Sequence, residues 1–499
     1  MATNRLATAV SCQQIREAEK AAFASGVDQA WLMNFAAAGA TEVIRQFFPR
    51  PGRATLYIGK GNNGGDGLVI ARLLRVNGWE VLLELTESPS KLSGLVNEQL
   101  AAFEATDAPN NVDPSGPHIL VDALLGSGAS GPLRESIAGP VQRLNAQRTQ
   151  HAAKVIAIDG PTGVDADTGE VQAGAVQADI TVALSQVKPG WLADSATNHV
   201  GRLALVPLPS LDPFLPRSKT PVSTLFTPDA WPGLLPPRAF DSHKGQMGRV
   251  AIWAGSSGLP GAARMASAAA VRAGGGLVTL FSANDALPML KSACTPEVML
   301  QDADQGVDTS PFDVVAVGSG LGRKCDADVL NLIGDCPKPL VIDADGLNAL
   351  STQIEILSNA AGPRILTPHP GEMARLEPRG DRSRMEWASA FSERFPGITL
   401  LLKGARTIVA ASGQPISFNT TGTPGMASGG MGDVLTGVIT ALLGQGLPPY
   451  DAARLGAWIC GRAAELAVYG DEQSEQSLCA TDVIDHLGRA FLDWQRGAY

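Results

Sequence analysis

Short apolar runs alternate with segments of helical length along almost the whole chain of 499 residues. Runs such as 54–58, 154–158 and 180–184 stay largely apolar instead of alternating with polar residues. Such runs are typical of parallel strands, which are buried because helices cover both faces of their sheet. The sequence therefore predicts an α/β fold, and a chain of this length exceeds the size of a single ordinary core.

A proline-rich stretch over residues 206–237 interrupts this alternation. Proline lacks a backbone N–H and fixes φ, so we expect a linker and an edge segment there, not a helix or a central strand. The pattern restarts with an apolar run at 249–254. We therefore predict two α/β domains, over residues 1–215 and 216–499.

The same periodicity places the remaining elements. We expect helices at 68–76, 262–273, 434–443, 452–469 and 482–494. We expect further strands at 80–85, 118–124, 277–282, 313–317, 339–342, 364–367 and 398–403, with 406–411 as an antiparallel partner of the last one.

The formal net charge of −10 argues against a nucleic-acid-binding surface, which would be basic. The six cysteines lie far apart without CxxC or zinc-ligand spacing, so we expect free thiols in a reducing compartment. The first ten residues lack the apolar core of a signal peptide. No apolar run reaches the length of about 18 residues that a membrane span needs, so we expect a cytoplasmic protein that does not contact membranes.

A glycine-rich loop at 59–67 follows the first strand and precedes a helical pattern. Glycine lets the backbone approach a ligand closely, and the amides at a helix start favour phosphate. The loop matches neither the usual dinucleotide fingerprint nor a P-loop. A tight structural turn is the alternative, but a turn requires neither Asn62 and Asn63 nor Asp66.

Two further strands end at acidic residues, Asp122 and Asp159. Because ligands bind beyond the carboxyl ends of strands in open α/β sheets, we expect these acids to converge with Asn62 and Asn63. Oxygen ligands of this kind suit a hard cation, and no Cys or His in these segments favours zinc. Each aspartate alone is also explained by a helix N-cap or an Asx turn.

Three segments resemble the NAD(P)H-hydrate epimerase family: GNNGGDGLVIAR at 61–72, VDALLGSG at 121–128 and DGPTGVDADTG at 159–169. The resemblance covers residues 10–210 and implies a Rossmann-like three-layer α/β/α sandwich. It implies a potassium ion on Asn63, Asp122 and Thr162, and Asp159 as the acid/base at the reacting ring. Thr162 keeps the hydroxyl where the family often has serine. The substrate-binding residues that it implies are Asn62, Asn63, Gly64, Gly65, Asp66, Gly126, Ser127, Gly128, Ala129, Ser130, Gly131, Pro132 and Asp159.

In the second half, the segment 419–433 is rich in small residues and leads into an apolar helical pattern. Glycines at 429–432 before a helix predict an anion site for a phosphoryl group. A carboxylate beside phosphate is unfavourable, so we expect Asp433 to act as a base toward a hydroxyl nucleophile. An N-cap role explains Asp433 but not the preceding run of small residues.

Two other loops follow strands in this half. Residues 403–407 lie between two expected strands, where Lys or Arg can neutralise nucleotide phosphates; a charged hairpin turn is the alternative. His369 lies between two prolines after the strand at 364–367. A rigid loop histidine fits a ligand contact, although a lone histidine is more often structural.

The second half resembles the ADP- or ATP-dependent NAD(P)H-hydrate dehydratases of ribokinase-like fold. The motifs are HKGQMGRV, GLPGAA, GSGLG, DADGLN, TPHPGEMARL, LKGART and GMASGGMGDVLTG, in this order between residues 243 and 437. The resemblance covers 225–495 and implies a ribokinase-like α/β/α sandwich with Asp433 as the catalytic base. It implies that Ala262, Gly322, His369 and Asp433 contact the hydrate, and that Lys403, Gly404, Ala405, Arg406, Thr407 and Gly432 hold ADP, whose charge Mg²⁺ screens.

Together, the two resemblances imply a bifunctional NAD(P)H-hydrate repair enzyme. Its first domain would interconvert the R and S hydrates of NADH and NADPH. Its second domain would phosphorylate the S hydrate, converting ADP to AMP, and the departing phosphate would restore the double bond. The residues alone do not decide between ADP and ATP, and we expect a homo-oligomer.

Two other functions compete with this interpretation. A small-molecule kinase would share the end of the second domain but has no use for the NNGGDG loop of the first. A nucleotide-sensing or RNA-associated binding protein would need no catalytic acids. The negative net charge argues against this alternative, and so do four aspartates in the motifs, Asp66, Asp122, Asp159 and Asp433.

Overall fold

The computed structural model describes residues 7–92, 94–109, 113–216, 223–231, 233–235, 237–470 and 472–499. These residues form two compact units, one extending up to residue 216 and the other from 223 to 498, and each has its own sheet. Part of the expected proline-rich linker, at 217–222, 232 and 236, lies outside the described residues. No helix within the described ranges has the length and apolar character needed to cross a membrane.

The first unit contains a fully parallel sheet in the order β3-β2-β4-β5-β6-β7. The chain runs from β2 outward to β3 and then returns to β4 on the other side of β2. A crevice for ligands forms where the strand order reverses in this way, beyond the carboxyl ends of β2 and β4. The strands are β1 (Ala7–Thr8), which precedes this sheet, and β2 (Arg53–Ile58), β3 (Glu80–Leu85), β4 (His118–Ala123), β5 (Lys154–Ile158), β6 (Ile180–Leu184) and β7 (Arg202–Val206).

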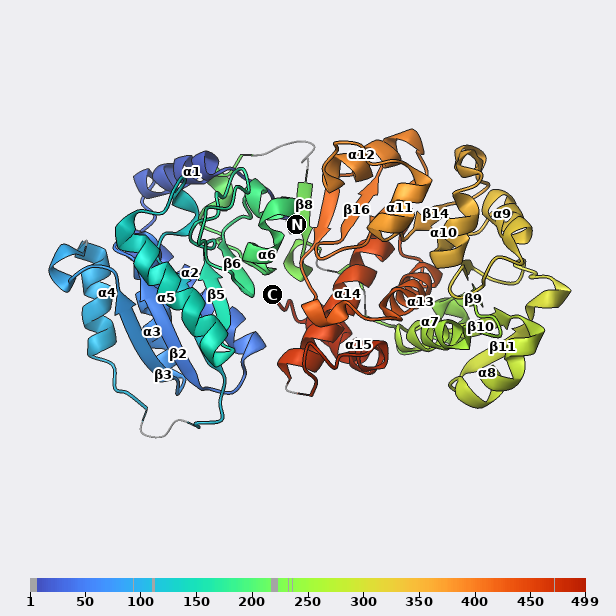
Figure 1. Cartoon of the computed structure of the whole chain (residues 1–499), viewed down its shortest axis with the longest axis horizontal. Helices are drawn as coiled ribbons and strands as arrows, with labels where there is room; N and C mark the ends of the chain where they lie inside the picture. Colours follow the sequence, from blue (N-terminus) through green and yellow to red (C-terminus); the bar gives the residue numbers. More distant parts are fainter. Residues whose placement is uncertain are drawn as a thin grey trace. The chain divides into compact units, whose positions relative to one another are not determined.

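Helices cover both faces of this sheet (Figure 1). Helices α2, α3 and α4 pack side by side on one face, and α5 packs on the other, where Val141 and Leu144 contact Leu120 and Val155 in one apolar cluster. The helices are α1 (Cys12–Ala24), α2 (Gln29–Phe47), α3 (Asn62–Val76), α4 (Gly94–Glu104), α5 (Glu135–His151) and α6 (Thr197–Val200).

The second unit contains a larger sheet in which β8-β17-β16-β15-β14-β13-β12-β9-β10-β11 lie side by side. Strands β9 to β15 are parallel, and β16 runs antiparallel to β15 and β17. The strands are β8 (Ser223–Phe226), β9 (Arg249–Trp253), β10 (Leu277–Ser282), β11 (Val298–Asp302), β12 (Val314–Val317), β13 (Leu340–Ile342), β14 (Arg364–Leu366), β15 (Ile398–Leu402), β16 (Ile408–Ala411) and β17 (Ile416–Asn419).

On one face of this sheet, α7, α13, α14 and α15 form a single apolar cluster with the strands, and α9 to α12 lie on the opposite face (Figure 1). Helix α13 approaches α7 so closely that a Cβ at Gly437 would lie 2.1 Å from the carbonyl oxygen of Ala266. This contact fixes the position of the start of α13. The helices are α7 (Pro260–Arg272), α8 (Leu287–Ala293), α9 (Asp326–Asp335), α10 (Ala344–Leu350), α11 (Pro370–Leu376), α12 (Arg384–Arg394), α13 (Met431–Gly444), α14 (Pro449–Tyr469) and α15 (Ala480–Gln495).

Both units are α/β/α sandwiches, which confirms the predicted fold class. The helix expected at 68–76 begins earlier, at Asn62, so residues 62–67 of the expected glycine-rich turn belong to α3. Glycine has a low helix propensity, so the sequence predicted a later start. Tertiary packing overrides that propensity here. The strand expected at 406–411 begins at Ile408, since Thr407 is still in a turn in which its hydroxyl donates to Gly404 O.

Candidate active sites

The carboxyl ends of β2, β4 and β5 bring together the residues expected to bind substrate in the first unit. Asn62, Asn63, Asp66 and Asp159 line a cavity of about 240 Å³ together with residues 126–128. Residues 128–132 line a neighbouring cavity of about 470 Å³, and both cavities share Leu125 and Gly128. The loop after β4 thus borders both cavities, as a loop binding an extended ligand would.

Two glycines of the NNGGDG motif serve close packing. A Cβ at Gly64 would lie 1.8 Å from the carbonyl oxygen of Gly59, and a Cβ at Gly65 would lie 2.6 Å from the side chain of Met33. Both glycines are buried, whereas Asn62 in the same turn is exposed. Backbone packing therefore explains these two glycines.

Asp159 follows β5 and receives three hydrogen bonds. Its Oδ1 accepts from Lys188 Nζ at 3.1 Å and from the Leu184 amide at 3.2 Å, and its Oδ2 accepts from the Ser127 hydroxyl at 2.5 Å. The residue has φ +49°, a left-handed conformation that is unfavourable for a residue other than glycine. Neither an N-cap nor an Asx turn accounts for these long-range partners.

Two acids near Asp159 have raised pKa values. Shielding from water, together with the charges of Asp159 and Glu19, raises the pKa of Asp66 well above its ordinary value. Burial, followed by the charge of Asp159, also raises the pKa of Glu19, which lines the same cavity. The sequence analysis missed Glu19 and Lys188, and no local motif marks either residue.

The residues expected to bind potassium lie near the ends of β2, β4 and β5. Asp122 is fully buried, and it accepts hydrogen bonds from the Thr162 amide at 2.7 Å and the Thr162 hydroxyl at 2.9 Å. Burial raises the pKa of Asp122 to about 6. Asn63 is buried, and neither polar atom of its side chain has a hydrogen-bond partner. A buried carboxylate and an unsatisfied amide oxygen are a donor set that fits a hard cation.

In the second unit, the first turn of α13 carries Asp433. Gly430 is the N-cap with φ +90°, so Asp433 is not the capping residue. Burial, reinforced by the charge of Asp343, raises the pKa of Asp433 to about 6. A carboxylate with this pKa next to a helix start is suited to accept a proton near neutral pH.

A buried ion pair lies beside this helix start. Lys403 Nζ is 2.8 Å from Asp343 Oδ1, and the Thr436 hydroxyl donates to Asp343 Oδ2 at 3.0 Å. Burial alone would raise the pKa of Asp343, but Lys403 and these hydrogen bonds hold it below its ordinary value. A Cβ at Gly432 would lie 3.3 Å from Lys403 Nζ, so a larger residue would crowd the ammonium. The structure thus brings Lys403, Gly432 and Asp433 together.

The other expected residues surround this group. His369 is the N-cap of α11, and its Nδ1 accepts from the Gly371 and Glu372 amides. Its exposed Nε2 lies 3.6 Å from Glu372, which is 3.7 Å from Lys403. His369 therefore has a structural role as the cap of α11, and it also borders the site. Asp343 and Thr436 are residues of this group that the sequence did not predict as site residues.

The remaining expected contacts lie on neighbouring loops. Ala262 packs against Gly320, where an added Cβ would lie 3.0 Å from the Ala262 Cβ. The Gly322 amide donates to Asp345, and Gly322 lines a cavity of about 1110 Å³. Arg384 of α12 donates to the carbonyls of Leu402, Lys403 and Arg406, which holds the loop 403–407 in place.

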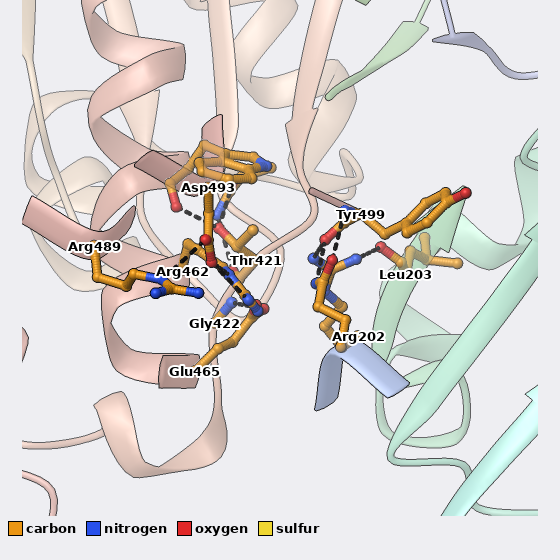
Figure 2. Close-up of polar contacts among 12 residues, drawn as sticks. Arg202, Leu203, Thr421, Gly422, Arg462, Glu465, Arg489, Asp493 and Tyr499 are labelled. Atoms are coloured by element: carbon orange, nitrogen blue, oxygen red, sulfur yellow. Dashed lines mark hydrogen bonds and ion pairs between the residues drawn. The ribbon is translucent and has the colours of Figure 1, made fainter. Parts of the chain in front are cut away.

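A buried charge cluster anchors the loop that leads to α13 (Figure 2). Arg462 pairs with Glu465 at 3.1 Å and with Asp493 at 2.8 Å, and Glu465 accepts from the Gly422 amide at 2.9 Å. The Thr421 hydroxyl donates to the Trp458 carbonyl at 2.9 Å. Helices α14 and α15 thus hold the start of the loop that ends at Asp433.

Both halves of the chain match known families. Residues 29–190 match the family described as YjeF-related protein N-terminus, and residues 250–487 match the NAD(P)H-hydrate dehydratase family. A solved structure of the ADP/ATP-dependent NAD(P)H-hydrate dehydratase from Bacillus subtilis, co-crystallized with ATP/Mg²⁺, is 29% identical. It covers 52% of this chain and 94% of its own, with a TM-score of 0.46.

Two curated relatives match almost from end to end. The bifunctional NAD(P)H-hydrate repair enzyme Nnr of Coxiella burnetii is 37% identical over 95% of this chain and 97% of its own length. The enzyme of the same name from Escherichia coli is 37% identical over 95% of this chain and 92% of its own length. With both halves and their order matched at this identity, the chain belongs to the family of bifunctional NAD(P)H-hydrate repair enzymes.

Proposed function

We propose that this chain repairs hydrated NADH and NADPH in two steps. The first unit epimerises the R and S hydrates, and the second dehydrates the S hydrate while converting ADP to AMP and phosphate. The observation that carries the proposal is the presence of an acid-bearing site in each unit, around Asp159 and around Asp433, in a chain of this family. Both epimers are then recovered by one polypeptide.

The dehydration uses phosphate as the leaving group. Asp433 accepts the proton of the hydrate's hydroxyl, whose oxygen attacks the terminal phosphorus of ADP while the bond to AMP breaks. Phosphate then leaves with the former C–O electron pair, and loss of a proton from the adjacent carbon restores the double bond. Lys403 and the amides at 429–432 offset the charge of the transferred group. The loop 403–407 holds the nucleotide, and Ala262, Gly322 and His369 border the hydrate.

Mg²⁺ bound with the nucleotide would screen the charge of its phosphates. Glu372 is a buried carboxylate whose Oε2 accepts from the His369 amide at 2.8 Å and lies 3.7 Å from Lys403, so its Oε1, which among the described residues has only the His369 ring nearby at 3.6 Å, is the oxygen that would fit such an ion. Asp343 is already occupied by Lys403 and Thr436.

The two epimers have the same composition, so a group that takes a proton from the substrate must also return it. Asp159 lines the first cavity, and its carboxylate accepts hydrogen bonds from three donors. It therefore fits this role. Potassium on Asn63, Asp122 and Thr162 would hold the ends of β2 and β4 and the loop after β5 in place. Residues 126–132 would take the phosphates of the substrate.

The assay is recovery of 340 nm absorbance from a prepared mixture of the R and S hydrates of NADH. With ADP and Mg²⁺, we expect a fast phase for the S epimer and a second phase limited by epimerisation. Parallel reactions with ATP decide which nucleotide is the donor. Absence of any recovery with either nucleotide would refute the repair function, and a stable phosphorylated product would favour a kinase.

Potassium dependence is tested in the same assay. Exchanging K⁺ for tetramethylammonium should slow the second phase and leave the fast phase unchanged, because the proposed ligands belong to the first unit. Asp122→Asn should weaken the response to added K⁺. A second phase of unchanged rate without K⁺ would show that epimerisation does not depend on this ion. The boundary at 215/216, the homo-oligomer and the cytoplasmic location stay predictions.

A further inference from the structure

A lysine reaches Asp159 from the protein interior. Lys188 follows β6, and its side chain is 0% exposed. Its Nζ lies 3.1 Å from Asp159 Oδ1, 3.0 Å from the Gln186 carbonyl oxygen and 4.9 Å from the centre of the Trp191 ring. Because Lys188 is fully buried and does not line the cavity, it can act on a ligand there only through Asp159.

The two oxygens of Asp159 have different surroundings. Lys188 and the Leu184 amide occupy Oδ1, whereas Oδ2 is bonded to the hydroxyl of Ser127, a residue that lines the cavity. The left-handed backbone at Asp159 is a strained conformation that surrounding contacts must maintain. The ion pair therefore does two things: it compensates the negative charge of a carboxylate that is only partly exposed, and it directs Oδ2 toward the cavity.

We propose that Lys188 is a positioning residue for epimerisation, which supplies the counter-charge of the Asp159 carboxylate and holds its Oδ2 ready to take up and return the hydroxyl proton of the hydrate. In this step the substrate O–H bond breaks as the Oδ2–H bond forms, a C=O bond forms, and the C–N bond of the hydroxyl-bearing carbon breaks with its electrons going to nitrogen. The nitrogen then adds to the other face of that carbonyl, and return of the proton from Oδ2 restores the hydroxyl on an inverted carbon. This inference rests on the proposed epimerase function and adds a residue to it.

Other charged groups face Asp159 and Lys188. Glu19, Arg16 and Cys12 come from α1, and Asp66 comes from α3. Burial raises the pKa values of Glu19 and Cys12, in the latter case to about 12, and neither a carboxyl group nor a thiol can supply a positive charge. Without Lys188, Asp159 would lose the cation that contacts it. The acid limb of the epimerisation rate should then move to higher pH.

The test uses the full chain with ADP, Mg²⁺ and the mixed hydrates. Lys188→Met should slow the second phase by about 100-fold or more, because it removes the cation that contacts the acid/base group and holds it in place. The fast S phase should stay within twofold. Lys188→Arg keeps the charge and should recover much of the rate. The matched control is Lys154→Met, since Lys154 begins β5 and pairs with Asp179 at 3.5 Å, away from the cavity.

The pH profile distinguishes positioning from a structural role. We expect the acid limb of the second phase to lie at higher pH in Lys188→Met than in the parent, and to stay in place in Lys188→Arg. A structural defect would lower the rate at every pH without moving the limb. An unmoved limb, or Lys188→Met within threefold of the parent, would overturn the inference.

A double variant keeps the test decisive if Lys188→Met does not fold. Asp159→Asn with Lys188→Met removes both buried charges, and we expect it to epimerise no more slowly than Asp159→Asn alone, because Lys188 acts only through Asp159. A further loss in the double variant would overturn the inference. If the parent chain itself shows no second phase above the spontaneous rate, the proposed epimerase fails, and that outcome is seen before any variant is made.

Discussion

Asp159 in the first unit and Asp433 in the second are the two acids assigned to catalysis, and their surroundings differ in where the nearby lysine goes. Lys188 contacts Asp159 directly, whereas Lys403 pairs with Asp343, and within the described part of the chain no cation forms an ion pair with Asp433. Burial therefore raises the pKa of Asp433 to about 6. The two aspartates thus differ in their electrostatic surroundings, because the nearby lysine pairs with the aspartate itself in the first unit and with another acid in the second.

The largest expected effect is on the second unit. Asp433→Asn removes the base for phosphorylation and should slow dehydration of the S hydrate by 10²–10⁴-fold, the range usual for a general base. The measurement is the initial rate of the fast phase at saturating ADP. Asp485→Asn, an exposed change in α15, is the control and should leave the rate unchanged. Equal rates for both variants would contradict the role of Asp433.

Asp159→Asn tests the other half of the comparison. The S hydrate should disappear at the parent rate, and the R hydrate should follow the spontaneous epimerisation rate, a loss on the order of 100-fold or more in the second phase. Both phases are read from a single progress curve. If the second phase keeps its parent rate, Asp159 is not the acid/base.

The pH dependence sharpens the comparison. Because the pKa of Asp433 is about 6, the base is protonated below that pH, and kcat/KM for the S hydrate should fall about tenfold per pH unit on the acid side. Above pH 6 the carboxylate is ionised and the rate should level off. Initial rates between pH 4.5 and 8, with all variants at constant ionic strength, check this. A limb near pH 4 would show that the Asp433 environment does not favour the neutral acid.

The smallest effect concerns the buried pair beside Asp433. Thr436→Val removes the hydroxyl that donates to Asp343 Oδ2, and it should lower the free energy of unfolding by about 1 kcal/mol. Urea unfolding measures this change. Thr440→Val lies one turn further along α13 and removes a hydroxyl that bonds only to the Thr436 carbonyl, so it leaves Asp343 satisfied. We expect only Thr436→Val to slow the fast phase as well, by a few-fold.

The local pattern of apolar residues was sufficient to predict much of the secondary structure. The strands at 80–85, 154–158, 180–184 and 277–282 have the predicted bounds, because continuous apolar runs between turn residues leave little choice. Boundaries failed where packing overrides propensity, as at α3, whose first turn contains two glycines that fit tightly against other residues. Motifs predicted Asp159 and Asp433 because both follow recognisable loops.

By itself, the sequence determined two α/β sandwiches and the loops that carry their acids, since apolar periodicity and glycine placement act over short stretches of chain. Only the tertiary structure decided that Lys188 contacts Asp159 and that Lys403, Glu372 and Asp343 lie together beside Asp433. These residues lie in or after different strands and helices, and Asp343 and Lys403 are 60 positions apart. Burial and charge pairing depend on that assembly, so the electrostatic surroundings of each proposed catalytic acid are a property of the fold and not of its motif.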